Sequence, residues 1–312
     1  MILAKDLWGA IDYKFLQIEI ADNVATVTIN RPEVLNGLHP EAHSEMERIW
    51  EDLGSNEQVK VAILTGAGSA FSAGGDLKDM ESRLKRDPSG GSGISAASAR
   101  RIVYNLLDFE KPLIGAVNGH AIGLGATLAL LTDIVISSKE AKWGDPHINI
   151  GLVPGDGGLA IWTVLIGPNK AKEMMMLGST ISAEFADQLG LINHVVDDDQ
   201  VMATASEIAL QLCDGPQAAL RGTKISVNNW LKSQFASLFE VSLAAELESM
   251  RHSDFSEGVN AALEKRTPKF NLLILKGYFS LVFGFCLSVN EATPSLWASE
   301  RKHLSNASRL AI

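Results

Sequence analysis

Hydrophobic and polar positions alternate with a period of two near the start of the chain. The segment VATVTI (24–29) shows this alternation and follows the turn residues Asp22 and Asn23, with a second alternating segment, FLQIEI, directly before the turn. This pattern predicts a β-hairpin. Apolar side chains then recur every three to four residues between Pro40 and Leu53, which predicts a helix with one buried face.

The middle of the chain contains three short, continuous apolar runs, at 61–65, 112–117 and 133–137. Such runs are typical of strands that are buried on both faces. Helical or glycine-rich stretches separate them, and DPSGGSG (87–93) is expected to be a flexible loop. Beyond residue 198 the pattern is mainly helical. The chain is therefore predicted to be an α/β protein built from crossover units.

These patterns divide the 312 residues into three regions. Residues 1–198 are predicted to form an α/β core, residues 199–270 a helical region, and residues 271–312 an apolar extension with a polar tail. Residues 271–289 are almost wholly apolar and just long enough to span a bilayer, but they contain two glycines and Lys276. We expect this segment to pack on the body or on a neighbouring subunit, with membrane contact as the alternative.

Composition and charge narrow the classes of function. The chain has 27 lysines and arginines against 37 aspartates and glutamates, which argues against nucleic-acid binding because phosphate contacts need a basic face. Its cysteines, Cys213 and Cys286, lie in apolar surroundings without paired spacing, which indicates neither a disulfide framework nor a metal site. Acidic and aromatic residues at the N-terminus replace the apolar run of a secretory leader, so we expect a cytoplasmic protein.

Two glycine-rich turns are the first candidates for chemistry. In GAGSAFSAGGDLKDM (66–80), Gly74 and Gly75 allow a sharp turn that leaves backbone N–H groups uncovered. The second turn, NGHAIGLGATLALL, leads into a predicted helix that begins near Gly125, and N–H groups at a helix start have no partner inside the helix. The Leu124 amide and an amide of the first turn are therefore suited to hold a carbonyl oxygen that becomes an oxyanion.

Four motifs together carry a resemblance to a known family. They are INRPEVLNGLHPE, FSAGGDLKDM, AVNGHAIGLGATLALLTDIVI and WGDPHINIGLVPGDGG, in this order. With the ending LEKRTPKF (263–270), they resemble the crotonase (enoyl-CoA hydratase/isomerase) superfamily over about residues 15–270. The resemblance implies a spiral of repeated ββα units followed by a helical trimerisation region, assembled as a homotrimer or a dimer of trimers.

The resemblance also implies a coenzyme A thioester as ligand, bound as part of the substrate, with no separate cofactor and no metal. The amides of Gly75 and Leu124 would hold the thioester oxygen. Further residues stand where the family binds the adenine and phosphate groups of coenzyme A, or within reach of a phosphate: Ala73, Asp76, Lys78, Lys265 and Arg266.

The two glutamates that a hydratase of this family uses are absent. Thr127 and His147 stand in their positions, 20 residues apart (147 − 127 = 20). Threonine is neither an acid nor a base near neutral pH, so Thr127 is expected only to contact the substrate, whereas histidine titrates near pH 6.5. Asp156 follows His147 by nine residues (156 − 147 = 9), and this pair is similar to that of the 6-oxocamphor hydrolase type of β-diketone hydrolases.

The sequence therefore predicts that His147 is a general base, oriented or kept protonatable by Asp156. Two simpler interpretations stand beside this one: Asp156 caps a helix that starts at Gly157, and His147 is a partly buried side chain with satisfied hydrogen bonds. His120, beside the second glycine turn, is a further candidate for substrate contact or else a surface residue.

Three functions are compatible with these residues. The favoured one is an acyl-CoA enzyme of fatty acid metabolism, a lyase of the enoyl-CoA hydratase/isomerase type that works through a thioester enolate. The second is a CoA-independent hydrolase of β-diketones, against which the intact FSAGGDLKDM motif argues because it lies on the nucleotide side. The third is a non-catalytic CoA-binding or scaffold protein, against which the newly placed acid and base argue.

Overall fold

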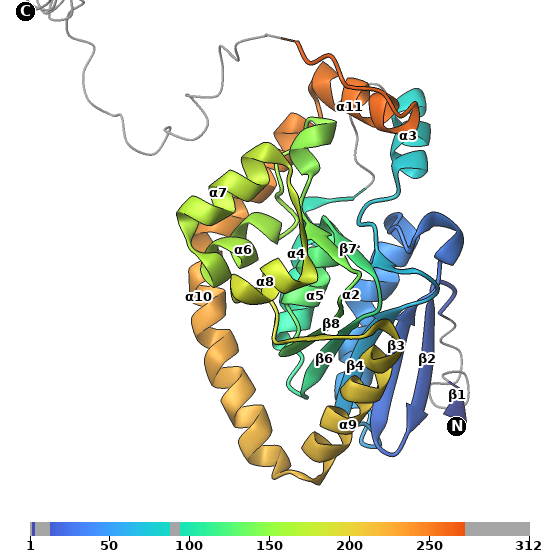
Figure 1. Cartoon of the computed structure of the whole chain (residues 1–312), viewed down its shortest axis with the longest axis vertical. Helices are drawn as coiled ribbons and strands as arrows, with labels where there is room; N and C mark the ends of the chain where they lie inside the picture. The colour runs from blue at the N-terminus through green and yellow to red at the C-terminus, as the bar shows by residue number, and fades with distance from the viewer. Residues whose placement is uncertain (1, 4–12, 88–93, 272–312) are drawn as a thin grey trace, which may run out of the picture. The chain divides into compact units, whose positions relative to one another are not determined.

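A computed structural model of the chain describes residues 2–3, 13–87 and 94–271 (Figure 1). The predicted loop at 87–93, apart from Asp87, and the predicted extension, apart from Asn271, lie outside the described residues. Within the described ranges, none of the helices combines the length and the apolar character needed to cross a bilayer.

The larger sheet contains the predicted hairpin. Strand β2 (Leu16–Ala21) pairs antiparallel with β3 (Val24–Ile29), and Asp22 and Asn23 turn between them with φ angles of 50° and 63°. Both residue types tolerate this left-handed conformation. The other strands are β1 (Ile2–Leu3), β4 (Val61–Gly66), β6 (Leu113–Val117), β8 (Ile134–Ser138) and β11 (His194–Val196). The order is β1-β2-β3-β4-β6-β8-β11, and every pairing from β3 to β11 is parallel.

A second, smaller sheet carries the loops of the candidate site. Its strands are β5 (Ala70–Ser72), β7 (His120–Ile122), β9 (Lys142–Gly144) and β10 (Thr180–Ser182), in the order β10-β9-β7-β5. Strands β5, β7 and β9 run parallel, whereas β10 is antiparallel to β9. Along the chain, each of β4, β6 and β8 is followed by one strand of the smaller sheet and then by a helix. This is the expected repeat of two strands and one helix.

Helices cover both sheets (Figure 1). They are α2 (Pro40–Ser55), α3 (Leu77–Arg86), α4 (Ala96–Asp108), α5 (Leu124–Leu130), α6 (Gly158–Ile166), α7 (Pro168–Leu177), α8 (Ala183–Gln188), α9 (Val201–Asp214), α10 (Gln217–Ser249) and α11 (Ser253–Leu263). Short 3-10 turns are η1 (Pro32–Val34), η2 (His147–Ile150) and η3 (Asp198–Gln200). Helix α9 packs on the larger sheet, where Ala205 and Ala209 contact a cluster that includes Ile63, Ile114 and Ile136.

Helix α10 spans 33 residues and runs from the end of α9 to the start of α11 (Figure 1). Phe235 and Phe239 on this helix are fully buried and belong to the main core. The ring of Phe239 lies 5.7 Å from that of Tyr104 on α4, in an edge-to-face arrangement. These aromatic contacts fix the C-terminal half of α10 against the core.

The elements predicted from the sequence are confirmed. The hairpin, the helix from Pro40, and the three buried strands all form, with boundaries within two residues of those expected. The helix expected near Gly125 begins at Leu124, and the one expected at Gly157 begins at Gly158. The mixed α/β class with a helical C-terminal region is also confirmed.

The contact between α9 and the larger sheet yields a stability prediction. Ile63→Ala should lower the free energy of unfolding by about 2–5 kcal/mol, because it leaves a cavity in a fully packed cluster. Leu210→Ala, on α9 at a side chain that is 46% exposed, is the control and should change stability by less than about 0.5 kcal/mol. Denaturation midpoints of both variants give the comparison, and equal midpoints would contradict the assigned packing.

Candidate active site

Three loops of the candidate site follow neighbouring strands of the smaller sheet. The turn with Gly74 and Gly75 follows β5, the turn with Leu124 follows β7, and His147 follows β9. Because β5, β7 and β9 are parallel neighbours, their carboxyl ends meet at one edge of the sheet. The sheet thereby gathers segments that are far apart in the sequence.

The two glycine turns touch each other. Gly74 has a φ angle of 82°, and a Cβ atom there would lie 2.7 Å from the Ile122 carbonyl oxygen and 3.3 Å from the Leu124 nitrogen. Only glycine combines this backbone conformation with so close an approach. Gly123, with a φ angle of 55°, donates its N–H to the carbonyl oxygen of Gly144 at 2.9 Å, which ties the second turn to the end of β9.

The amides of Gly75 and Leu124 have no hydrogen-bond acceptor among the residues that the structure describes. Leu124 is the first residue of α5, so its N–H has no intrahelical partner. Gly75 lies opposite Leu38 in an isolated β-bridge. The two hydrogen bonds of this bridge run from the Leu38 N–H to the Gly74 carbonyl oxygen and from the Asp76 N–H to the Leu38 carbonyl oxygen, so neither uses the Gly75 N–H. Both Gly75 and Leu124 line one pocket, where two such donors can bind an oxyanion.

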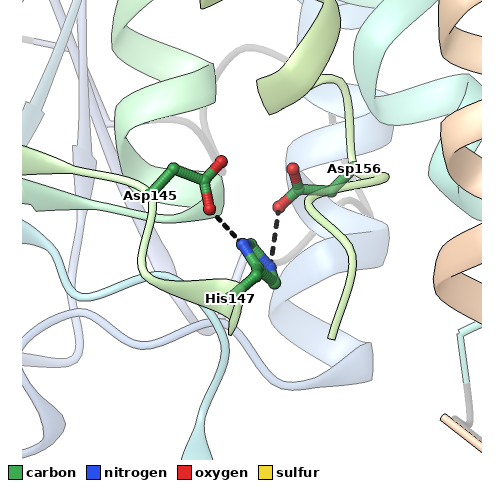
Figure 2. Close-up of side chains that lie close together, drawn as sticks. All are labelled: Asp145, His147 and Asp156. Atoms are coloured by element: carbon green, nitrogen blue, oxygen red, sulfur yellow. Dashed lines mark hydrogen bonds and ion pairs between the residues drawn. The ribbon is translucent and has the colours of Figure 1, made fainter. Parts of the chain in front are cut away.

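His147 lies between two carboxylates in this pocket (Figure 2). Its ring packs on the second glycine turn, since a Cβ atom on Gly123 would lie 3.3 Å from His147 Cε1. Nδ1 directly contacts Oδ1 of Asp145, and Nε2 lies 3.6 Å from Oδ2 of Asp156. The predicted pair is therefore brought together, but the residue in direct contact with the imidazole is Asp145.

Asp156 uses its two oxygens differently. Oδ1 accepts hydrogen bonds from the Gly158 N–H at 3.2 Å and from the Thr127 hydroxyl at 3.4 Å, and Oδ2 faces His147. Asp156 therefore satisfies an amide at the start of α6 and also takes part in the pocket. Thr127 is fully buried and reaches the site through Asp156.

Burial and mutual charge set the protonation of this group. Burial alone would lower the pKa of His147, but the charges of Asp145 and Asp156 outweigh it and raise the pKa to about 10. Burial raises the pKa of Asp156, and the positive charge of His147 opposes that rise. The two neighbouring carboxylates therefore favour the positively charged form of the imidazole.

Two residues of the site were not singled out from the sequence. Asp145 stands only two positions before His147. An acidic residue so close to a candidate histidine is the sequence feature from which its role could have been predicted. Glu246, on α10, lines the pocket, and its side chain has no hydrogen-bond partner within the described ranges. Burial and the charge of Asp156 raise the pKa of Glu246 to about 8. A glutamate on a helix 90 residues after Asp156 (246 − 156 = 90) carries no local sequence signal.

The rest of the pocket wall is largely apolar. It is formed by Leu38, Met80, Ala99, Leu152, Leu243, Leu247, Met250 and Phe255. The polar side chains are His43, which contacts Glu47 at 3.0 Å, and Arg83, which pairs with Asp79 at 2.7 Å. Apolar walls exclude water and strengthen the interactions of the charged groups.

The residues expected near the nucleotide lie on the first turn and at the start of α3. Ala73 is half-buried and donates its N–H to the Leu35 carbonyl oxygen at 2.9 Å. Asp76 is buried, caps α3 by accepting from the N–H of Lys78 at 3.1 Å, and forms an ion pair with Arg31 at 2.9 Å. The Asp76 carboxylate thus shapes the turn, whereas the exposed Lys78 side chain is available to an anion.

The three remaining residues predicted to contact the substrate or its phosphates lie outside the pocket. His120 is exposed, and its Nδ1 accepts a hydrogen bond from the Lys142 N–H at 3.1 Å, at the outer side of β7. Lys265 is exposed just after α11 and has a φ angle of 55°. Arg266 pairs with Glu257 at 2.6 Å. None of the three lines the pocket that contains His147.

Asp145, His147 and Asp156 have donor atoms within 4.8 Å of one another, a composition that could accept a divalent cation. A metal requires a lone pair on the imidazole. Both ring nitrogens of His147 instead face carboxylate oxygens, whose charges favour the protonated ring. The arrangement fits an ion-paired histidine better than a metal ligand.

Comparison with known proteins places this geometry in a family. The family model described as enoyl-CoA hydratase/isomerase matches residues 19–272. The chain belongs to the enoyl-CoA hydratase/isomerase family. It is 34% identical over 261 residues to the 1,2-epoxyphenylacetyl-CoA isomerase of Escherichia coli, covering 82% of this chain and 98% of that protein. It is 32% identical over 251 residues to the short-chain-enoyl-CoA hydratase of Clostridium acetobutylicum, covering 80% and 94%.

Solved structures of the enoyl-CoA hydratase/isomerase family share the fold. An enoyl-CoA hydratase/isomerase from Mycobacterium paratuberculosis superposes with a TM-score of 0.74 at 35% identity, covering 80% of this chain and 98% of that one. An enoyl-CoA hydratase/isomerase from Pseudoalteromonas atlantica has a TM-score of 0.74 at 29% identity, with coverage of 83% and 100%. These similarities confirm the crotonase-like arrangement that the sequence predicts.

The uncovered amide of Leu124 leads to a prediction about the backbone. Leu124→Pro removes this N–H and should reduce turnover by about 10²- to 10³-fold, the usual effect of losing one oxyanion donor. The fold should survive, because proline is favoured in the first position of a helix. Leu124→Ala, which keeps the N–H, is the matched control and should retain most activity. Full turnover in a folded Leu124→Pro protein would exclude this donor.

Proposed function

We propose that the protein acts on an acyl-CoA thioester and stabilises its enolate, which forms either when water adds to the β-carbon of an enoyl-CoA or when a proton leaves the carbon beside the carbonyl group. The observation that carries this proposal is the pair of uncovered amides, Gly75 and Leu124, in the same pocket as His147 and Asp156. Relatives named for 1,2-epoxyphenylacetyl-CoA and short-chain enoyl-CoA support a CoA thioester as the class of substrate.

The two amides act on the thioester oxygen. Negative charge moves onto this oxygen as the enolate forms, so the N–H groups bind the transition state more strongly than the ground state. The donors belong to the backbone at fixed turns and need no rearrangement during the reaction. The apolar wall of the pocket keeps water away and suits a hydrocarbon acyl group.

His147 and Asp156 form the pair that transfers protons in place of the two glutamates. Their facing atoms are 3.6 Å apart and both residues line the pocket, so one can accept a proton while the other donates one. An acid and a base next to each other beside an enolate can serve hydration of an enoyl-CoA or migration of its double bond. We propose one of these two reactions, a lyase or an isomerase reaction.

A CoA-independent hydrolase of β-diketones is the second candidate, and the His147 and Asp156 pair is the observation in its favour. The names of the relatives favour a CoA thioester instead. A purely binding role does not explain why three carboxyl groups and a histidine are buried together. Burial of charged groups destabilises a fold unless they are well paired.

Ligand-induced stabilisation separates these candidates. Denaturation midpoints measured with coenzyme A, crotonyl-CoA, acetoacetyl-CoA and a cyclic β-diketone should rise with the CoA compounds, since binding to the native state adds about 2.7 kcal/mol at a ligand concentration of 100 times Kd. Stabilisation by the diketone alone would reject the CoA proposal. Stabilisation by CoA thioesters without turnover of any of them would support the binding role.

The paired geometry of His147 and Asp156 predicts strongly non-additive mutations. His147→Ala and Asp156→Asn should each reduce turnover of the substrate found in that screen by about 10²- to 10⁴-fold. The double variant should be little slower than the slower single variant, because residues that act as a unit do not contribute independently. Asn keeps the shape of the side chain and an oxygen that can accept from the Gly158 N–H, so Asp156→Asn should remain folded, which its denaturation midpoint checks. Near-wild-type turnover in this variant would leave Asp156 as a helix cap only.

A further inference from the structure

Both ring nitrogens of His147 face carboxylate oxygens. Nδ1 contacts Oδ1 of Asp145, and Nε2 lies at ion-pair distance, 3.6 Å, from Oδ2 of Asp156 (Figure 2). A neutral imidazole has one N–H and one lone pair. In either neutral tautomer, one nitrogen lone pair would therefore point at a carboxylate oxygen. The doubly protonated ring presents an N–H to both aspartates.

We propose that Asp145 is a positioning residue that holds His147 as an imidazolium, so that His147 starts the reaction as proton donor and Asp156 as proton acceptor. This inference rests on the proposed function and reverses the role of general base that the sequence suggests for His147. Asp145 acts through His147, since it does not line the pocket and its side chain is almost completely buried.

The chain around Asp145 makes room for this contact. Asp145 lies between Gly144, which ends β9, and Pro146, so its backbone is tied to the sheet on one side and restricted on the other. A Cβ atom on Gly158 would lie 2.1 Å from Oδ2 of Asp145, so this glycine leaves the space that the carboxylate occupies. Oδ2 itself is buried and has no hydrogen-bond partner among the described residues. A carboxylate with one unsatisfied oxygen is a poor structural element, which favours a role through its charge.

The charged groups around His147 come from several elements. Asp145 and Asp156 flank it, Glu246 faces it from α10, and His43 on α2 acts on Asp156. The aspartates outweigh the effect of burial and raise the pKa of His147 to about 10, in agreement with the geometry. Because this pKa is raised, the imidazolium is present below about pH 10 and is lost above it.

The resulting proton transfers balance. In migration of a double bond, Asp156 removes a proton from the carbon beside the carbonyl group, and the electron pair of the broken C–H bond forms the enolate, whose charge rests on the oxygen held by the Gly75 and Leu124 amides. In hydration, Asp156 instead removes a proton from the water whose oxygen bonds to the β-carbon, and the electron pair of the C=C double bond forms the enolate. His147 then gives its Nε2 proton to the carbon that is protonated in the product. Asp156 returns its proton to Nε2 of His147, which restores the starting state without an outside reagent.

Asp145→Asn tests the proposal because it keeps the shape of the side chain and removes its charge. Nitrogen NMR of ¹⁵N-histidine-labelled protein, with the His147 signals assigned from His147→Gln, should show both ring nitrogens protonated in the wild type up to at least pH 8. In Asp145→Asn the ring should become neutral in this range, with a pKa displaced toward the ordinary value of about 6.5. Turnover should fall by about 10²-fold or more with little change in KM, and the alkaline limb of the rate profile should move to lower pH.

Asp133→Asn is the matched control, since Asp133 is an aspartate outside the pocket that pairs with Lys224 at 2.8 Å. It should lower the denaturation midpoint but leave the His147 spectrum and the rate profile unchanged. A wild-type His147 that titrates near 6.5, or an unchanged spectrum in Asp145→Asn, overturns the proposal. Selective broadening of the His147 signals by added Mn²⁺ would also overturn it, because the three side chains would then bind a cation.

The spectroscopic result does not depend on the substrate. If no CoA thioester stabilises the protein, the proposed function fails while the protonation of His147 can still be read. If CoA thioesters bind and react but His147 is neutral, the proposed function stands and the role of Asp145 is rejected.

Discussion

The site depends on the parallel pairing of three very short strands. β5, β7 and β9 are three residues each, and their pairing places two glycine turns and His147 at one edge of the smaller sheet. The approach is so close that Gly74 has no space for a side chain. The amides proposed as oxyanion donors are consequently fixed by backbone packing, and side chains are left free to change the chemistry at the same position.

Such a change is visible in the charged cluster. Asp145, His147, Asp156 and Glu246 are buried or nearly buried, although desolvation of charged groups opposes folding. Phe235 and Phe239 hold α10 against the core and keep Glu246 in place. The apolar contacts of α10 therefore offset the electrostatic penalty of burying this cluster.

Much of the architecture can be predicted from local patterns. Alternation predicts the hairpin from β2 to β3, and continuous apolar runs predict β4, β6 and β8, because burial on two faces requires apolar residues throughout. The strands of the smaller sheet are too short to show a period. Gly75, Leu124, His147 and Asp156 can be found from motifs, whereas the contact with Asp145 depends on the rotamer of His147. Glu246 enters the site through tertiary packing alone.

Because α10 contributes Glu246, the residues of the site are not all synthesised at the same stage. Gly75, Leu124, His147 and Asp156 leave the ribosome well before Glu246, which follows Asp156 by 90 residues (246 − 156 = 90). A compact unit generally folds as a whole, and α10 belongs to the same unit and core as the sheets. The pocket can therefore be completed only after α10 has left the ribosome, late in the synthesis of each chain.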